Sequence, residues 1–247
     1  MSRLSQVTKA RGQLPPRIIL YGTEGIGKTT FGASAPNPII VQTEDGSDNI
    51  EVSRLPKRDN YEDVRDDLDE LVRSKHEFKT VVVDSLDWLE RLIWSDICHR
   101  EGKDSIELCC GGYGKGYTHA IKYWKDFTEY LDMLRAKRII TICLAHAKIE
   151  RYEDPEHPAY DRYGPRLHKT ARDYMCEWAD AVLFATRRLT TVEDKGNKDR
   201  TRAIGRHDER ILRTTGTAAC IAKNRYGIFG DLPLGWDEFY SLIGGQK

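Results

Sequence analysis

The chain has 247 residues, and its 39 lysines and arginines balance 39 aspartates and glutamates, so its formal net charge is zero. This balance argues against a strongly basic nucleic-acid binder, and any DNA binding would have to rest on local patches and depend steeply on salt. No apolar run approaches the roughly 20 residues that span a bilayer and no secretory leader pattern opens the chain, which predicts a cytoplasmic protein without a membrane partner.

The first half of the chain alternates apolar runs with amphipathic ones. A polar arm is expected over residues 1–16, ending in two prolines. Continuous β-branched runs are typical of parallel strands buried on both faces, and apolar residues at helical spacing beneath a charged face predict helices. The elements expected here are strands over 17–21, 37–44 and 79–85 and helices from residue 28, over 60–75 and over 86–98.

The second half begins with a loop rich in glycine and tyrosine and ends in short strands. The elements expected are the loop over 109–120 feeding a long helix, a strand over 138–148, a polar segment to about residue 168, and a helix over 169–178. Four short strand-like runs follow between residues 180 and 225. The whole pattern predicts one α/β domain over 17–247, with a mainly parallel central sheet flanked by helices and antiparallel strands near the C-terminus.

The stretch "YGTEGIGKTT" contains the phosphate-binding pattern G-x-x-x-x-G-K-[ST] in full, between a predicted strand and a predicted helix. Its glycines let backbone N–H groups turn inward around the phosphates. The Lys28 ammonium is expected to reach the β- and γ-phosphates, and the Thr29 hydroxyl to bind Mg²⁺. The predicted nucleotide-binding residues are Gly22, Thr23, Glu24, Gly25, Ile26, Gly27, Lys28, Thr29 and Thr30.

Asp84 ends the apolar run "TVVVD", in a strand expected beside the P-loop strand. A carboxylate there can orient water on Mg²⁺, although an ordinary helix-capping aspartate is the alternative. ATP is favoured over GTP. The segment "GNKDR" at 196–200 has its aspartate one position too early for the guanine-reading N-K-x-D, and a charged hairpin tip explains it better.

Three further places supply candidate catalytic groups. Glu44 ends the strand after the P-loop helix, where it could polarise the attacking water, and His146 ends "ITICLAH" on the same rim, where it could sense the γ-phosphate. Lys223 and Arg225 alternate in "IAKNRYG", so both point to one face of a strand and suit the charge on a transferring phosphate. The simpler alternatives are a surface acid, a structural histidine and a solvated basic strand end.

This order of motifs resembles the RecA-like core shared by RecA recombinases and DnaB-type helicases, over residues 17 to about 235. "IAKNRYG" is similar to the finger segment of DnaB-type helicases, and the compact length, "GYGKGY" and "VVVDS" resemble phage-encoded RecA-like ATP-binding proteins. Some of those act as single-strand annealing recombinases. The resemblance implies that Glu44 activates water, that His146 couples the γ-phosphate to a DNA loop, and that Lys223 and Arg225 act in a neighbouring subunit.

The resemblance also implies two loops that contact single-stranded DNA, at roughly 100–118 and 147–168. Aromatic and basic side chains interleaved on flexible loops suit binding without sequence preference. Acidic residues balance the cations in the second stretch, so a mobile polar loop is the alternative. The residues predicted to bind DNA are Tyr113, Lys115, Tyr117, Lys148, Arg151, Arg162, Tyr163 and Arg166.

The function favoured by these features is an ATPase, expected to be DNA-dependent, that acts in phage-type recombination or strand annealing within a bacterial host cell. It would work as a homo-oligomer, ring or helical, on single-stranded DNA, and a single-strand-binding protein is a further partner to consider. A DnaB-like helicase motor and a DNA-annealing module that ATP only stabilises remain alternatives. A nucleotide kinase is disfavoured because no Arg-rich lid pattern is found.

Overall fold

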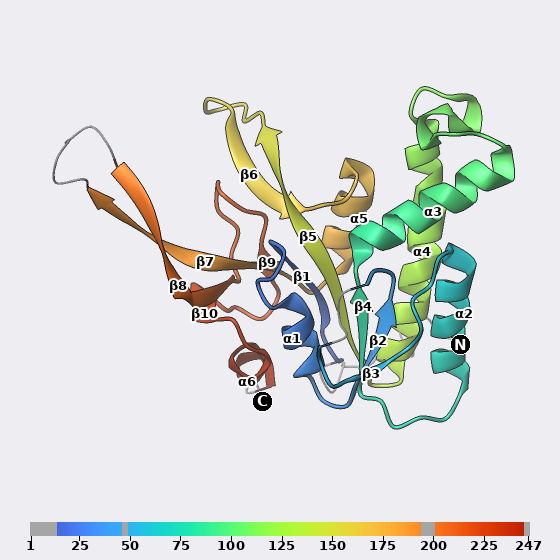
Figure 1. The fold of residues 1–247 in the computed structure, drawn as a ribbon, viewed down its shortest axis with the longest axis horizontal. Helices are drawn as coiled ribbons and strands as arrows, with labels where there is room; N and C mark the ends of the chain where they lie inside the picture. The colour runs from blue at the N-terminus through green and yellow to red at the C-terminus, as the bar shows by residue number, and fades with distance from the viewer. Residues whose placement is uncertain (1–13, 46–48, 194–200, 245–247) are drawn as a thin grey trace, which may run out of the picture.

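The structure, a computed structural model, describes residues 14–45, 49–193 and 201–244. Helices cover both faces of a central sheet (Figure 1). The strands are β1 (Arg17–Gly22), β2 (Pro38–Gln42), β3 (Ser53–Arg54), β4 (Thr80–Asp84), β5 (Ile140–Tyr152), β6 (Tyr160–Pro165), β7 (Ala181–Glu193), β8 (Thr201–Arg213), β9 (Lys223–Asn224) and β10 (Asp231–Pro233). The helices are α1 (Lys28–Ala33), α2 (Tyr61–Arg73), α3 (Leu86–Glu101), α4 (Lys115–Ala136), α5 (Lys169–Trp178) and α6 (Trp236–Gly244), with a 3₁₀ segment at Ile106–Gly111.

The strand order of the sheet is β10-β8-β7-β1-β5-β4-β2-β3. The strands from β7 to β3 pair in parallel, whereas β8 pairs antiparallel with β7 and with β10. The predicted α/β class, a mainly parallel sheet with antiparallel strands near the C-terminus, is therefore confirmed.

The prediction that the strand ending at Asp84 lies beside the P-loop strand is wrong. β1 pairs with β5 and β7, so β5 is inserted between β1 and β4. Parallel neighbours are joined by long crossovers, so neighbours in the chain need not be neighbours in the sheet. The insertion places His146 in register with Gly22, at the middle of the carboxyl edge of the parallel strands.

The sheet separates two apolar cores because alternate side chains of each strand point to opposite faces. On β1, Ile19 and Tyr21 pack toward α2, α3, α4 and α5, while Ile18 and Leu20 pack toward α1 and α6. Each of these four residues has no exposed surface. A strand buried on both faces is a rigid base for the loop that follows it.

The polar segment expected after the fourth strand is instead an antiparallel hairpin. β5 continues past His146 to Tyr152 and pairs with β6 from Ala147↔Pro165 to Tyr152↔Tyr160. This β5–β6 hairpin extends away from the sheet, beside α5 (Figure 1). Charged residues alternate across its two faces and pair with one another, so the segment forms a ladder without being apolar.

The predicted loop over 109–120 is also shorter than expected. α4 begins at Lys115, after Gly114 with φ 71°. Lys115 and Tyr117 therefore lie in the first turn of a helix, not in a flexible loop. Gly116 allows this turn to approach the 3₁₀ segment, because an added Cβ would lie 2.1 Å from the carbonyl oxygen of Ile106.

Two predictions concern parts of the chain outside the described residues: residues 1–13 of the polar arm, and the charged tip at 196–200. At the end of the arm, the carbonyl oxygen of Pro15 accepts a hydrogen bond from Arg135 Nε at 2.7 Å and that of Pro16 accepts one from the Thr141 N–H at 3.3 Å. Over the described ranges, no helix has the length and apolar character needed to cross a bilayer.

Candidate nucleotide site

The P-loop joins β1 to α1 as the sequence predicts. Gly25 and Gly27 have φ values of 67° and 108°, a left-handed conformation that favours glycine. Lys28, the first residue of α1, is buried, and its Nζ donates to the carbonyl oxygens of Gly22 at 3.3 Å and Thr23 at 3.1 Å. Burial lowers the pKa of Lys28, while the acidic side chains around it oppose this shift. The ammonium is thus held at the loop, whose G-x-x-x-x-G-K-[ST] pattern is typical of phosphate binding.

A pocket of about 560 Å³ opens at the carboxyl edge of the sheet, in front of this loop. It brings together three predicted residues from separate strands: Glu44 lies two residues after β2, Asp84 ends β4, and His146 lies within β5. The prediction that His146 ends its strand is wrong, because β5 continues past it into the hairpin. Of the other predicted nucleotide-binding residues, Gly22, Thr23 and Ile26 do not line the pocket, and Gly22 and Ile26 are buried. The pocket is lined by Glu24, Gly25, Gly27, Lys28, Thr29, Thr30, Glu44, Asp45, Ile50, Asp84, Trp88, His146, Arg166 and Arg210.

Thr29 and Asp84 form the pair expected to hold Mg²⁺. The Thr29 hydroxyl donates to Asp84 Oδ2 at 2.8 Å, although the two residues come from α1 and β4. Burial raises the pKa of Asp84, and the hydrogen bond from Thr29 and the charge of Lys28 oppose this. One carboxylate and one hydroxyl fit Mg²⁺, which keeps several waters and takes further oxygens from phosphates. The donor set present therefore suits a magnesium nucleotide.

Glu44 lies across the pocket from the P-loop, beside His146. His146 Nδ1 is 3.9 Å from Glu44 Oε2. Burial raises the pKa of Glu44 to about 7, and the nearby His146 opposes this rise. A carboxylate with a pKa near neutrality is matched to general-base work at physiological pH.

Asp87 was not among the predicted site residues, yet it organises this side of the pocket. It is 3% exposed and accepts hydrogen bonds from the His146 backbone N–H at 3.0 Å and from Arg166 Nη2 at 2.7 Å. Its oxygens also lie 3.1 and 3.2 Å from His146 Nδ1. Burial alone would raise the pKa of Asp87, but these partners hold it well below its usual range. In the sequence, only its position in the first turn of the helix after Asp84 could have indicated a role at the site.

Arg210 was also missed, and no local pattern could have indicated it. It lies on β8 and its Nη1 donates to the carbonyl oxygen of Ile26 at 3.2 Å. A Cβ added at Gly27 would lie 2.9 Å from the same Nη1. Arg210 therefore covers the P-loop side of the pocket, a position that only the folded chain reveals.

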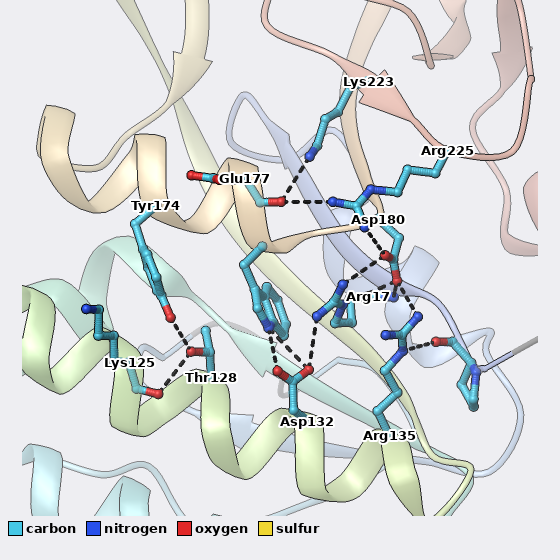
Figure 2. Close-up of polar contacts among 12 residues, drawn as sticks. Arg17, Lys125, Thr128, Asp132, Arg135, Tyr174, Glu177, Asp180, Lys223 and Arg225 are labelled. Carbon is cyan, nitrogen blue, oxygen red and sulfur yellow. Dashed lines mark hydrogen bonds and ion pairs between the residues drawn. The ribbon is translucent and has the colours of Figure 1, made fainter. Parts of the chain in front are cut away.

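Lys223 and Arg225 lie at the opposite edge of the sheet from the P-loop, near the start of β1. Figure 2 shows both pointing toward the end of α5. Lys223 Nζ and Arg225 Nη2 donate to the carbonyl oxygen of Glu177 at 3.2 and 3.3 Å, and Arg225 Nη1 lies 3.3 Å from Asp180 Oδ1. The two cations share one direction, as predicted, but face away from the nucleotide pocket of their own chain. Their action on a neighbouring subunit stays a prediction.

The residues predicted to bind DNA lie in two parts of the fold, around the start of α4 and on or next to the β5–β6 hairpin. Tyr113 is 99% exposed and Lys115 is exposed at the start of α4, whereas Tyr117 stacks on His168 with ring centroids 4.0 Å apart. On the β5–β6 hairpin, Arg162 bonds to Glu150 within the chain. Three of the remaining residues have other places in the fold: Lys148 donates to the Leu167 carbonyl oxygen, Tyr163 stacks on Phe184, and Arg166 lines the nucleotide pocket. Arg151 is exposed and lies 3.7 Å from Asp161.

A parallel sheet with a P-loop, a Thr29–Asp84 pair and a facing acid defines a nucleotide-binding P-loop protein. The chain matches the family model described as an AAA domain over residues 14–226, and it belongs to this family. Membership implies ATPase activity in general, with a bound nucleotide and typically Mg²⁺. Comparison with curated proteins returns no match.

Proposed function

We propose that the chain is a RecA-like ATPase that acts on single-stranded DNA in recombination or strand annealing of the phage type, in the cytoplasm of a bacterial host. One observation carries this proposal: the hairpin that would meet DNA begins at the nucleotide site. β5 carries His146 at the pocket and continues directly into the hairpin, and β6 returns to Arg166 at the same pocket. DNA bound to the hairpin would therefore affect the positions of His146 and Arg166 beside the bound nucleotide.

One face of the hairpin carries partly exposed side chains that suit a sequence-neutral contact with bases. Ile149 and Tyr163 lie opposite each other, and Arg151 follows two residues along the same face. Their exposed fractions reach 61% for Ile149 and 36% for Tyr163. Tyr163 also ends an aromatic stack through Phe184 to Tyr21, the residue before Gly22, with centroids 5.0 and 4.8 Å apart. A base stacked on Tyr163 would rest on a platform anchored in the P-loop strand.

The pocket residues divide the work of hydrolysis. Backbone N–H groups of the P-loop and the Lys28 ammonium would neutralise the phosphates, and Thr29 and Asp84 would hold Mg²⁺, which supplies charge stabilisation when bound. Glu44 in its carboxylate form accepts a proton from the attacking water. ADP and phosphate are the expected products.

The location of Lys223 and Arg225 supports an oligomer. Cations at the edge opposite the P-loop cannot serve their own site, but they could complete the site of a neighbour in a ring or a helical assembly. Arginine fingers supplied from outside are worth on the order of 10³–10⁵ in rate. A single-strand-binding protein is a further proposed partner.

The test of DNA dependence is ATP turnover with and without single-stranded DNA. In the variant Arg151→Ala/Tyr163→Ala we expect the stimulation by DNA to be lost while basal turnover is retained. Arg162→Ala is the matched control, because this residue lies on the same hairpin but faces Glu150. DNA stimulation that is equal in all three proteins, or absent from the wild type, would refute the proposed role.

A mixing experiment tests the shared site. Lys28→Ala subunits lack phosphate binding but keep Arg225, and Arg225→Ala subunits have the opposite defect. If fingers act across subunits, mixing the two inactive proteins restores part of the turnover. Turnover that is independent of protein concentration and is not restored by mixing would contradict the shared site. Strand annealing with a non-hydrolysable ATP analogue separates an annealing module from a motor, since only the motor needs hydrolysis.

A further inference from the structure

Arg166 has a position that neither the ATPase core nor the DNA-binding hairpin explains. It follows β6 directly, so it belongs to the foot of the hairpin, yet its side chain lines the nucleotide pocket. Its backbone N–H donates to the carbonyl oxygen of His146 at 2.8 Å. Arg166 is thus joined by its main chain to the point of β5 that carries the predicted phosphate sensor.

The guanidinium is held from one side by a buried carboxylate. Arg166 Nε and Nη2 lie 3.1 and 2.7 Å from Asp87 Oδ2. These bonds use one edge of the guanidinium, and its Nη1 corner makes no hydrogen bond within the described ranges 14–45, 49–193 and 201–244. A planar arginine fixed at two nitrogens keeps little rotational freedom, so the third nitrogen is pre-oriented for another acceptor.

The same carboxylate also fixes His146. Asp87 accepts from the His146 backbone N–H and faces its Nδ1, while the Ser85 hydroxyl donates to Oδ1 at 3.1 Å. His146 in turn lies 3.9 Å from Glu44. Arg166, His146 and Glu44 line this side of the pocket, and the buried Asp87 lies behind them and bonds to Arg166 and His146. Water is expected to attack the terminal phosphate on the side where Glu44 lies.

The other arginine of the pocket lies elsewhere. Arg210 contacts the Ile26 carbonyl oxygen and covers Gly27, on the P-loop side. A nucleoside diphosphate and a triphosphate would both occupy the P-loop, and the third phosphate is expected on the side of the attacking water, where Glu44 lies. The two arginines should therefore respond differently to the third phosphate.

We propose that Arg166 contacts the terminal phosphate of the bound nucleoside triphosphate from within the same chain, with Asp87 as the residue that positions both Arg166 and His146. This inference rests on the proposed ATPase function and assigns to the nucleotide site a residue that sequence patterns place in a DNA loop. Binding of a triphosphate then fixes the foot of the hairpin, and loss of the terminal phosphate releases one of its anchors.

The test is nucleotide affinity in the absence of DNA, measured by titration calorimetry with a non-hydrolysable ATP analogue and with ADP, both with Mg²⁺. Arg166→Ala is expected to weaken analogue binding roughly 10- to 150-fold, the range of a charge-assisted hydrogen bond, and to leave ADP binding within about twofold. Arg210→Ala is the first control and should weaken both ligands alike. Arg162→Ala, on the same hairpin but outside the pocket, is the second and should change neither.

The positioning role of Asp87 needs a separate readout. In a double-mutant cycle, Asp87→Asn and Arg166→Ala should each reduce discrimination between the analogue and ADP, and their combination should add little to the larger single effect. Arg166→Lys keeps a charge without the two-point bond to Asp87 and should give an intermediate loss. With a side chain 36% exposed, Arg166 tolerates these replacements better than Asp87 does, so the arginine variants test the proposal even if Asp87→Asn unfolds.

Two outcomes would overturn the inference: unchanged discrimination in Arg166→Ala, or equal losses for both ligands as in Arg210→Ala. The result is independent of the proposed DNA role. If discrimination falls as expected while DNA never stimulates turnover, the function in recombination fails and the assignment of Arg166 stands. If DNA stimulates turnover while discrimination is unchanged, the function in recombination stands and the assignment of Arg166 fails.

Discussion

Replacing Asp180 with asparagine is expected to destabilise the fold by about 3 kcal/mol at neutral pH. This carboxylate has an exposed side-chain fraction of 6% and lies 3.0 Å from Arg17 Nη2 and 2.8 Å from Arg135 Nη2. It also accepts the Arg17 backbone N–H at 3.1 Å, at the start of the P-loop strand (Figure 2). An asparagine would turn an N–H₂ group toward at least one of these donors.

The magnitude follows from which partners are desolvated. Breaking a buried ion pair by removing one partner costs about 3–5 kcal/mol. Arg225, whose side chain is 55% exposed, adds little because exposed pairs are screened by water. Arg17 keeps Asp132 at 3.1 Å and the Trp178 ring at 5.1 Å as alternative partners, which favours the lower end of that range. For a domain of this size, such a loss lowers the melting temperature by about 6–12 °C.

The assay is urea denaturation of the wild type and Asp180→Asn over a series of pH values. Burial alone would raise the pKa of Asp180, but the hydrogen bonds and charges of Arg17 and Arg135 hold it below its usual value. The stability that this carboxylate contributes is thus present above the unfolded pKa of about 4 and is lost as pH falls through the lower folded value. The gap between the two proteins should shrink below pH about 4.

Asp132→Asn is the matched control, since Asp132 also bonds to Arg17 but has a 47% exposed side chain. We expect it to cost less than about 1 kcal/mol. A gap below about 1 kcal/mol for Asp180→Asn at pH 7, or one that grows on acidification, would refute the argument.

Three further predictions concern the nucleotide pocket. Because burial raises the pKa of Glu44 to about 7, wild-type turnover should rise with pH through that value as the carboxylate forms. The Glu44→Gln variant should lose about 10²–10⁴-fold in turnover yet still bind ATP. Retained turnover in this variant would exclude Glu44 as the base. Thr29→Val, which removes the donor to Asp84, should abolish the gain in ATP affinity that Mg²⁺ gives, whereas Thr29→Ser should keep it; an equal response of the two variants to chelation by EDTA would contradict the metal assignment. Gly22→Ala should destabilise the protein by about 1–3 kcal/mol in thermal unfolding, because the new Cβ would lie 2.5 Å from the Ala185 carbonyl oxygen. An unchanged melting temperature would show that the backbone of β7 shifts at little cost in free energy.

The features that the sequence predicted well are those that depend on local spacing. The P-loop, the buried strands and the places of Glu44 after β2 and of Asp84 at the end of β4 follow from residues a few positions apart. His146 is expected at a strand end but lies within β5, because the charged residues after it pair with β6. The insertion of β5 between β1 and β4 does not, because strand order depends on crossovers whose packing is decided by the whole fold. The P-loop residues, Glu44, Asp84 and His146 could therefore be anticipated at the pocket, but neither their arrangement nor the presence of Arg166 and Arg210 could be.

The two segments expected to be loops differ from the prediction for a shared reason. Polar, glycine-rich segments are expected to be flexible, whereas Gly114 and Gly116 allow a helix to begin close to its neighbour. In the hairpin, charged side chains pair across the strands and replace the apolar alternation on which strand prediction depends. Arg166 meets Asp87, 79 residues earlier in the chain, and no spacing rule connects such partners.

Strand β1 has different partners at its two ends. Gly22 opens the phosphate loop at one end, and Arg17 at the other shares Asp180 with Arg225. The four residues between them have no exposed surface and pair with β5 on one side and β7 on the other, so the strand is held rigidly along its length. In the proposed assembly, an Arg225 that contacts the neighbour's phosphates would no longer pair with Asp180. Assembly would then change the partners of the carboxylate that binds one end of β1, while the other end of the same strand opens the P-loop.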